Sequence, residues 1–475
     1  MNRNNIWIHV GIAVVLVMMA AVLGQIGRWK TTLHENVIDK QERVENVKKS
    51  LATARNSRPE IAVRFKPGVS LERIRAIASS NNDRLQDNIE YVNGLTYIDD
   101  LDDADAQSVA NQYAAMTDVV VYAESNDLVE LDDPSPQGSL NDGVNRESFS
   151  HPNDPQFVDQ WALNNLGQDG GKQRADIDAL QAWTKTKGSD EVVVAVLDTG
   201  VDFTHVDLRE NMWIRPENIP AYTDNELGTF NDINGFNGTD KLLDPMDDNG
   251  HGTHCAGIIG AEGDNGEGIV GINWHVKIMP LKFLGRGGFG SVEDAIEAIN
   301  YAIDRKKHGV NIRIISASWG STAKSKALED TIRAAGDAGI LFVAAAGNDG
   351  SNNDSRPHYP SNYDLPNVIS VAALDRNDQL AGFSNFGVKT VHVAAPGKDI
   401  LSTWLNDGYR EASGTSMATP YVSGIAALVI ASEPKISMEK LHERILNSVD
   451  KIDSLNGEVA SGGRICAAKA LGLSE

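Results

Sequence analysis

The sequence predicts an α/β protein in which a small α+β domain precedes a large domain whose central parallel sheet is flanked by helices. Residues 191–197 are almost all β-branched or apolar, which is typical of a strand buried on both faces of a parallel sheet. Residues 418 to about 432 have the apolar composition of a long buried helix. The chain has 475 residues, and about 320 of them follow residue 153, enough for one large core.

The N-terminus is predicted to be an export signal covering residues 1–24. Arg3 precedes a run at residues 6–24 that is apolar apart from His9. The small residues before Gln25 suit cleavage there, although the run is also long enough to span a bilayer. We therefore expect a secreted (extracellular or periplasmic) protein, and the alternative is an uncleaved membrane anchor.

The small domain is predicted at about residues 59–131. Strand patterns at 60–65, 94–98 and 119–123 alternate with helical patterns at 70–77 and 103–116. This order suggests a small α+β (ferredoxin-like) domain within residues 25–133. Residues 134–152 are rich in Pro, Ser, Gly and Asn and are interpreted as a linker that is cut on maturation, before a large domain at 153–475.

The composition restricts the partners. A net charge of −23 argues against nucleic acids and anionic membrane surfaces, and it is compatible with bound cations. The two cysteines, Cys255 and Cys466, do not make a disulfide framework. Both are expected to be small buried hydrophobic side chains, although a single bridge remains open.

Three residues have the types and contexts that nucleophilic catalysis needs. Asp198 ends the β-branched strand, His251 begins a glycine-rich helix, and Ser416 lies directly before the apolar helix. A serine at the positive end of a helix dipole suits acyl transfer. Taken alone, the three are more simply an Asx-turn, a cap and a plain turn, but the chain order Asp, His, Ser is that of a known triad.

Two further polar residues, Asn348 and His254, lie near these motifs. Asn348 follows another predicted strand, where its amide can donate to a developing oxyanion. His254 lies three residues after His251, but the helix has no glutamate like that of zinc proteases, so a metal pair is not favoured.

These blocks closely resemble those of the subtilisin-like serine proteases. The matching segments are Val196-Leu-Asp-Thr-Gly200, His251-Gly-Thr-His254, Ala346-Gly-Asn348 and Gly414-Thr-Ser-Met-Ala-Thr-Pro420, with smaller blocks such as Lys282-Phe-Leu-Gly285. The resemblance covers roughly residues 153–475. It implies a serine endopeptidase with Ser416 as nucleophile, His251 as base, Asp198 as its partner and Asn348 in the oxyanion hole. The alternatives are a membrane-anchored processing protease of narrow specificity and a non-catalytic binding scaffold.

The resemblance also assigns a role to residues 25–133. They look like the propeptide of this family, which assists folding and then inhibits the enzyme within the same chain. Residues 121–126 are similar to the closing strand of that domain. The expectation is a self-processing zymogen whose mature form is a monomer acting on protein or peptide substrates.

Substrate contacts follow from two segments that resemble the family's substrate-pairing strands. Glycines in them let another backbone approach closely. Asp349 and His358 are expected near the first pocket, where they would favour polar or basic side chains. The candidate residues are Gly285, Gly288, Gly290, Ser318, Trp319, Gly320 and His358.

Calcium is the cofactor that the resemblance implies. Carboxylates, one Asn side chain and loop carbonyls would surround the ion, and such oxygen donors suit Ca²⁺. The candidate ligands are Asp154, Asp207, Gly263, Asn265, Glu267 and Ile269. Asp244, Asp247 and Asp248 are either a second site or a solvated acidic loop. Residues 209–243 are expected to be a surface insertion without an assigned role.

Overall fold

The structure is a computed structural model that describes residues 60–102, 104–131, 151–240 and 242–473. All of them belong to one compact unit, Pro59–Glu475. The predicted signal segment 1–24 lies outside the described residues, as does almost all of the predicted linker 134–152.

The N-terminal domain (residues 60–131) has a four-stranded antiparallel sheet in the order β2-β3-β1-β4 and two helices. Its elements are β1 (Ile61–Phe65), α2 (Leu71–Ser80), β2 (Asp83–Asn88), β3 (Leu95–Asp100), α3 (Ala106–Ala114) and β4 (Val120–Ser125). The side chains of Ser70 and Asp105 cap the two helices by accepting from backbone N–H groups. These strands and helices form an α+β arrangement, and α3 begins later than the predicted helical pattern at 103–116, after its cap Asp105.

Within the described residues, the large domain is built on a nine-stranded sheet. Neighbouring strands are parallel except for the antiparallel pair β18 and β19 at one edge. In spatial order the strands are β18 (Val449–Lys451), β19 (Gly463–Ile465), β15 (Val393–Pro396), β14 (Val368–Leu374), β13 (Leu341–Ala345), β12 (Ile312–Ala317), β6 (Gly188–Asp198), β10 (His275–Lys282) and β9 (Phe236–Asn237).

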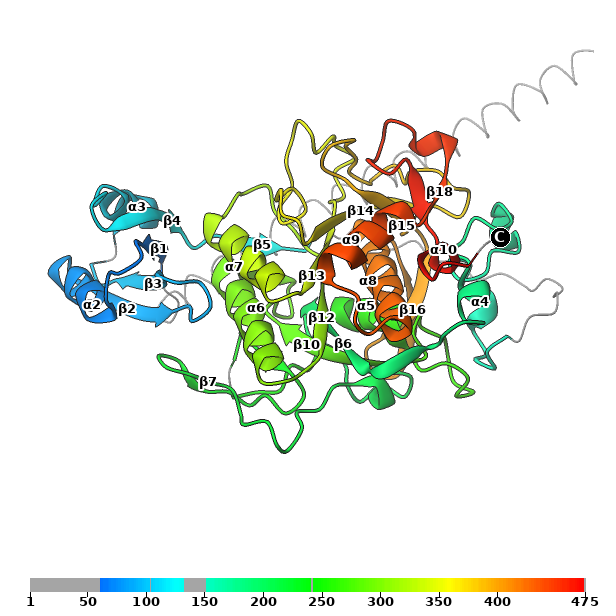
Figure 1. Cartoon of the computed structure of the whole chain (residues 1–475), viewed down its shortest axis with the longest axis horizontal. Helices are drawn as coiled ribbons and strands as arrows, with labels where there is room; N and C mark the ends of the chain where they lie inside the picture. The colour runs from blue at the N-terminus through cyan, green and yellow to red at the C-terminus, as the bar shows by residue number, and fades with distance from the viewer. Residues whose placement is uncertain (1–59, 103, 132–150, 241, 474–475) are drawn as a thin grey trace, which may run out of the picture. The chain divides into compact units, whose positions relative to one another are not determined.

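Helices cover both faces of this sheet (Figure 1). On one side lie α6 (Val292–Lys307) and α7 (Lys326–Asp337), and on the other α5 (His251–Gly260), α8 (Thr415–Ser432) and α9 (Met438–Asn447). Alternate residues of β6 serve the two cores: Val194 packs with α5 and α8, whereas Ala195 packs with α6. The predicted strand, buried on both faces, is therefore confirmed.

Shorter elements complete the large domain. Hairpin β16–β17 packs against α5, and β7–β8 lies in the predicted insertion 209–243. Their bounds are β16 (Ile400–Trp404), β17 (Gly408–Ala412), β7 (Thr223–Asp224) and β8 (Gly228–Thr229), and the short helices are α4 (Ala179–Ala182), α10 (Ala467–Ala470), η2 (Phe157–Asp159), η3 (Gln168–Gly170), η4 (Arg209–Asn211) and η5 (Asp453–Leu455).

Helix α8 begins at Thr415, earlier than the predicted start at 418. Gly414 precedes it in an extended conformation, so the helix starts directly after this glycine. Ser416 consequently lies within the first turn. Among the described helices, α8 alone is long and apolar enough to cross a membrane, and 89% of its apolar window is buried inside the domain.

The N-terminal domain contacts the large domain in two ways. Its side chains cap the N-termini of α6 and α7, and its apolar residues share a core with α6. Glu124 accepts hydrogen bonds from the Lys326 and Ala327 amides at the start of α7, each at 3.0 Å. Asn126 accepts from the Glu293 amide at the start of α6. Apolar residues of β1 and β3, including Tyr97, join the α6 core. Acceptors at helix N-termini satisfy amides that have no partner within the helix.

We predict that Ile425→Ala, in the buried centre of α8, lowers the free energy of unfolding by about 2–5 kcal/mol, because it leaves a cavity against the sheet. Chemical denaturation of the variants in a Ser416→Ala background measures this without self-digestion. Ile214→Ala, at a residue 62% exposed, is the matched control and should change stability little. Equal losses for the two variants would contradict the packing described for α8.

Candidate active site

Asp198 and His251 meet where β6 ends and α5 begins. Asp198 is the last residue of β6, and its Oδ1 lies 2.7 Å from His251 Nδ1. Both side chains are buried. Helix α5 approaches the loop after β6 so closely that a Cβ on Gly252 would stand 2.1 Å from the Gly200 carbonyl oxygen. Only glycine fits at position 252, and this contact sets the position of the His251 ring.

Asp247 anchors the start of α5. Its carboxylate accepts from the amides of Gly250 and Thr253 and from the hydroxyls of Thr199 and Thr253. A carboxylate with these partners at a helix N-terminus acts as a cap and also complements the helix dipole. The Thr199 hydroxyl accepts in turn from the Gly252 amide at 2.9 Å, which ties the loop after Asp198 to the helix.

The three aspartates considered for a second calcium site face separate partners. Asp247 caps α5, Asp248 pairs with Lys282 at 2.7 Å, and Asp244 accepts from the amides of Asn231 and Asn234. The described structure does not gather them around a common point, so we do not propose a second ion there.

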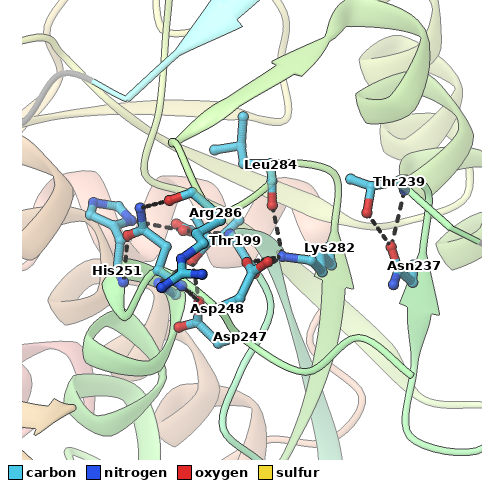
Figure 2. Close-up of polar contacts among 12 residues, drawn as sticks. Thr199, Asn237, Thr239, Asp247, Asp248, His251, Lys282, Leu284 and Arg286 are labelled. Carbon is cyan, nitrogen blue, oxygen red and sulfur yellow. Dashed lines mark hydrogen bonds and ion pairs between the residues drawn. The ribbon is translucent and has the colours of Figure 1, made fainter. Parts of the chain in front are cut away.

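Lys282 is a buried residue at the end of β10 to which the sequence alone assigns no role. Its ammonium donates to the carbonyls of Thr199 and Leu284 and to Asp248, at 2.6, 2.9 and 2.7 Å (Figure 2). It therefore ties the segment after β6 to the segment after β10. The signal was a single lysine at the end of an otherwise apolar strand, where a charge needs fixed partners.

Ser416 is held by contacts with two neighbouring segments. Its hydroxyl donates to the Ser318 carbonyl at 3.0 Å, and the Ser318 hydroxyl donates to the Ser416 carbonyl at 2.8 Å. The Cys255 thiol, one turn past His251 on α5, donates to the same Ser416 carbonyl at 3.5 Å. Through these bonds the structure brings together the three segments that carry Ser416, His251 and Ser318.

Asn348 lies beside the residue that precedes Ser416. Its Oδ1 accepts from the Thr415 amide at 2.8 Å and from the Thr415 hydroxyl at 3.0 Å. Fixing the oxygen of the amide group also fixes the direction of its NH₂ group, which is the donor an oxyanion needs. The structure therefore holds the Asn348 side chain against Thr415, the residue that precedes Ser416.

The two predicted substrate-pairing segments already hold a strand. β5 (Leu128–Glu130) pairs antiparallel with β11 (Phe289–Ser291), and Glu130 forms an antiparallel bridge to Gly320 on its other side. The Leu131 amide donates to the Gly288 carbonyl at 3.0 Å. Sequence analysis missed β5, because three residues are too few for a recognisable strand pattern.

The remaining predicted substrate residues lie around this strand. Gly290 is opposite Val129 in the β5–β11 ladder, and the Gly285 amide donates to the Phe289 carbonyl. The Trp319 ring is buried and packs against Phe283 with centroids 4.7 Å apart. The Trp319 side chain is therefore part of the core beside Phe283.

His358 packs directly against Gly320 and Gly347. A Cβ on Gly320 would stand 1.9 Å from its ring, and one on Gly347 would stand 2.9 Å from it. The ring is buried, and the adjacent Ser361 hydroxyl lies 3.5 Å from its Nδ1. Asp349, the other predicted pocket residue, is exposed.

The predicted calcium ligands come together around one loop. Asp207 accepts from the Asn265 side chain at 2.8 Å and from the Ile269 amide at 2.9 Å, and Asp154 accepts from the Asp264 amide at 2.8 Å. The other oxygen of Asp154 is buried and has no hydrogen-bond partner among the described residues. This buried, unpartnered carboxylate oxygen fits a cation. Of the other candidates, Gly263 packs against Trp274, and the exposed Glu267 donates its amide to the Asn265 side chain.

His254, Cys255 and Cys466, which the sequence analysis also considers, have structural roles. His254 is buried with its Nε2 facing the carbonyls of Ile400 and Arg410. Burial lowers the pKa of His254 to about 3, so the ring is neutral and donates to carbonyls. Cys255 and Cys466 are buried thiols rather than the halves of a bridge, and burial raises the pKa of Cys466 to about 11.

We predict that Lys282→Met lowers the free energy of unfolding by about 1–3 kcal/mol, because two buried carbonyls lose their donor. It should also lower kcat, since the loop after Asp198 loses an anchor. Lys277→Met, on the same strand but partly exposed, is the control. Denaturation midpoints and peptide hydrolysis rates measure both effects, and equal behaviour of the two variants would contradict the anchoring role.

Comparisons with known proteins agree with this geometry. The sequence model of the subtilase family, Peptidase_S8, matches residues 189–462. The chain is 38% identical over 312 residues to a thermophilic serine proteinase of Bacillus sp. strain AK1, covering 65% of this chain and 69% of that protein. It is 35% identical over 320 residues to thermitase of Thermoactinomyces vulgaris, covering 67% and 99%.

Among solved structures, a protease from Pseudoalteromonas arctica aligns with a TM-score of 0.55 and 29% identity, covering 68% of this chain and 99% of that one. The matched range 189–462 of this chain includes Asp198, His251, Asn348 and Ser416. The chain belongs to the subtilase family and is a subtilisin-like serine endopeptidase.

Proposed function

We propose that Ser416, His251 and Asp198 hydrolyse peptide bonds through an acyl-enzyme. Ser416 attacks the carbonyl carbon while His251 takes its proton, and His251 then protonates the leaving amine. A water molecule, activated by the same ring, releases the acyl group. The observation that carries this assignment is the 2.7 Å contact between Asp198 and His251, which holds the ring by its Nδ1 and stabilises the imidazolium.

Asn348 and the backbone N–H of Ser416 are proposed to stabilise the oxyanion. Ser416 lies in the first turn of α8, where backbone amides have no partner within the helix. The hydrogen bonds from Thr415 hold the Asn348 side chain in place before a substrate arrives. Such fixed donors contribute most when they need no reorganisation during the reaction. Losing one such side chain costs about 10²–10³ in kcat, a magnitude established for subtilisin itself.

The N-terminal domain is proposed to be a propeptide that inhibits the enzyme within the same chain. The observation that supports this is β5, which occupies the groove between β11 and Gly320 as an added strand. A substrate that binds as an extended strand would need the same backbone partners. While β5 is in place, the groove is closed to other chains.

The same domain is proposed to assist folding. The large domain depends on parallel strands far apart in sequence, and such contacts form slowly. Glu124 and Asn126 supply acceptors to the starts of α7 and α6. These caps would stabilise two sheet-covering helices before the rest of the sheet is complete, which suits a template.

Calcium is the proposed cofactor, held by Asp154, Asp207, Asn265 and the loop carbonyls around Gly263, Glu267 and Ile269. When bound, it would neutralise the two buried carboxylates and fix the loop, without taking part in peptide hydrolysis. Asp154 and Asp207 lie on different segments from the loop, so the ion would join parts of the chain that are far apart in sequence.

The enzyme is proposed to be exported and to act as a monomer on protein or peptide substrates. The support for export is the apolar run at residues 6–24, which lies outside the described residues. The negative net charge favours neither nucleic acid nor an anionic membrane as a partner. Cleavage in the linker 134–152 would release the mature enzyme from everything before it, whether signal or anchor.

We predict that the wild-type chain loses roughly residues 25–130 or more over time, whereas Ser416→Ala stays intact, because self-processing needs the nucleophile. Intact mass of both proteins, expressed from residue 25, measures this and gives the new N-terminus. Cleavage of both at the same rate would show that another protease matures the chain. If both stay intact and neither hydrolyses a peptide, the proposed activity is wrong.

We predict that His358→Gly shifts the first-pocket preference toward larger side chains, because it removes a ring that packs against Gly320. Profiling with a peptide library gives the preference of each variant, and His358→Gln tests whether polarity or volume decides. The wild type is expected to favour polar or basic residues at this position. A wild-type profile restricted to large apolar residues would contradict this assignment.

A further inference from the structure

Three buried carboxylates from distant segments meet at one point outside the site described above. Asp87 comes from β2 of the N-terminal domain, Asp224 from β7 of the insertion, and Glu297 from α6. Their exposed fractions are 0%, 1% and 3%, and one oxygen of each lies within 4.8 Å of the others. We call these three residues the carboxylate triad of the interface.

Most oxygens of this triad have no hydrogen-bond donor among the described residues. Both oxygens of Asp87, both of Glu297 and Oδ2 of Asp224 are buried without a partner. The remaining oxygen, Oδ1 of Asp224, accepts from the amides of Glu226 and Leu227. The Asn88 amide favours the charged form of Asp87 but does not reach it in hydrogen-bonding geometry. Five buried acceptor oxygens of the triad therefore have no donor among the described residues, and one oxygen of each side chain lies within 4.8 Å of the others.

Few positive charges lie near the triad. Glu90 and Glu226 add two more carboxylates, whose oxygens lie within 4.8 Å of one another and of Asp224. Arg75 pairs with Glu226 at 3.0 Å, and the Asn300 amide donates to Glu90 at 2.7 Å. These two donors bind Glu226 and Glu90 at the rim and do not reach the five unpartnered oxygens of the triad.

Buried like charges without a counter-charge are costly, and the local pKa values reflect this. Burial, together with the neighbouring carboxylates, raises the pKa values of Asp87, Glu90 and Glu297. Arg305, the nearest buried guanidinium on α6, is already bound to Asp304 and Asp232. The arrangement lacks one positively charged group at its centre.

We propose that the carboxylate triad binds a calcium ion that joins the N-terminal domain, the 209–243 insertion and helix α6. The donors are all carboxylate oxygens, which suit a hard cation rather than zinc or copper. Five unpartnered oxygens, with Glu90 at the rim, approach the six to eight that calcium prefers. Calcium also tolerates the irregular geometry expected when ligands come from three separate segments, whereas magnesium requires a near-ideal octahedron.

This site differs from the calcium loop around Asp207 in what it connects. Asp87 belongs to the N-terminal domain, whereas Asp224 and Glu297 belong to the large domain. Calcium would therefore bind more tightly when the two domains are together, and by linkage it would hold them together by the same factor. The insertion thereby acquires a role, since it supplies Asp224.

The test counts calcium ions bound by the full chain carrying Ser416→Ala, which cannot process itself. Equilibrium dialysis with Ca²⁺ gives the number of ions, and adding Glu297→Gln should lower it by one. Asp207→Asn is the matched positive control and should remove a different ion, so that the two losses add. Glu329→Gln, on α7 and paired with Lys324, should remove none.

Thermal melting distinguishes loss of the ion from loss of the fold. In a chelator, Glu297→Gln should melt at a higher temperature than its parent, because it removes a buried charge from a repulsive cluster. Adding calcium should raise the melting temperature of this variant by less than it raises the melting temperature of the parent. A variant that merely misfolds would melt lower in both conditions. In that case Asp87→Asn and Tb³⁺ luminescence of the parent, sensitised by the nearby Tyr222, provide the same measurement.

Two outcomes would overturn the proposal. One is an unchanged ion count and an unchanged calcium-dependent rise in melting temperature in Glu297→Gln. The other is stabilisation of the parent by acid but not by calcium, which would mean that shared protons neutralise the triad. Because every measurement uses the Ser416→Ala chain, failure of self-processing in the wild type would not affect the result.

Discussion

The site depends on the close approach of α5 to the loop that follows β6. A side chain at position 252 would collide with the Gly200 carbonyl, so the two backbones touch without side chains between them. This contact, closed by the Thr199 hydroxyl, places His251 against Asp198. Because β6 is buried on both faces, its end cannot shift without disturbing two cores at once. The relative positions of the Asp198 and His251 side chains therefore depend on the packing of the whole sheet.

Much of this could be predicted from the sequence, because it rests on local patterns. The β-branched run of β6, the apolar composition of α8 and the glycine-rich blocks identified the parallel sheet and the residues around Ser416. Each of these signals lies within a few consecutive residues. The apolar run predicts a start of α8 at 418, which is too late, because Thr415 and Ser416 are polar and do not belong to the run. Gly414 is the signal that marks the true start.

What could not be predicted depends on contacts between distant segments. β2 is a polar strand without alternation, and β5 is a strand only because β11 provides its partner. Glu124 caps a helix that begins about 200 residues later in the chain. Lys282 was visible as a residue but not as an anchor, because its carbonyl partners come from two loops. The carboxylate triad likewise unites residues that no spacing rule connects.

The interface between the domains combines contacts of opposite character. Apolar residues of β1 and β3 share a core with α6, and the caps at α6 and α7 are fully hydrogen-bonded. The carboxylate triad in the same interface has unpartnered oxygens instead. An interface built in this way is stable in its apolar and capped parts and sensitive to ions at one place.

The pairing of β5 with β11 also affects how readily other peptide chains can bind at this place. In the uncut chain β5 is tethered to the groove, and a short tether gives an effective concentration in the millimolar range. An external peptide of equal intrinsic affinity at micromolar concentration competes poorly against such a neighbour. The proposed cleavage would convert this local competitor into one that is diluted by the surrounding volume. The onset of binding to other chains would then depend on how dilute the enzyme is.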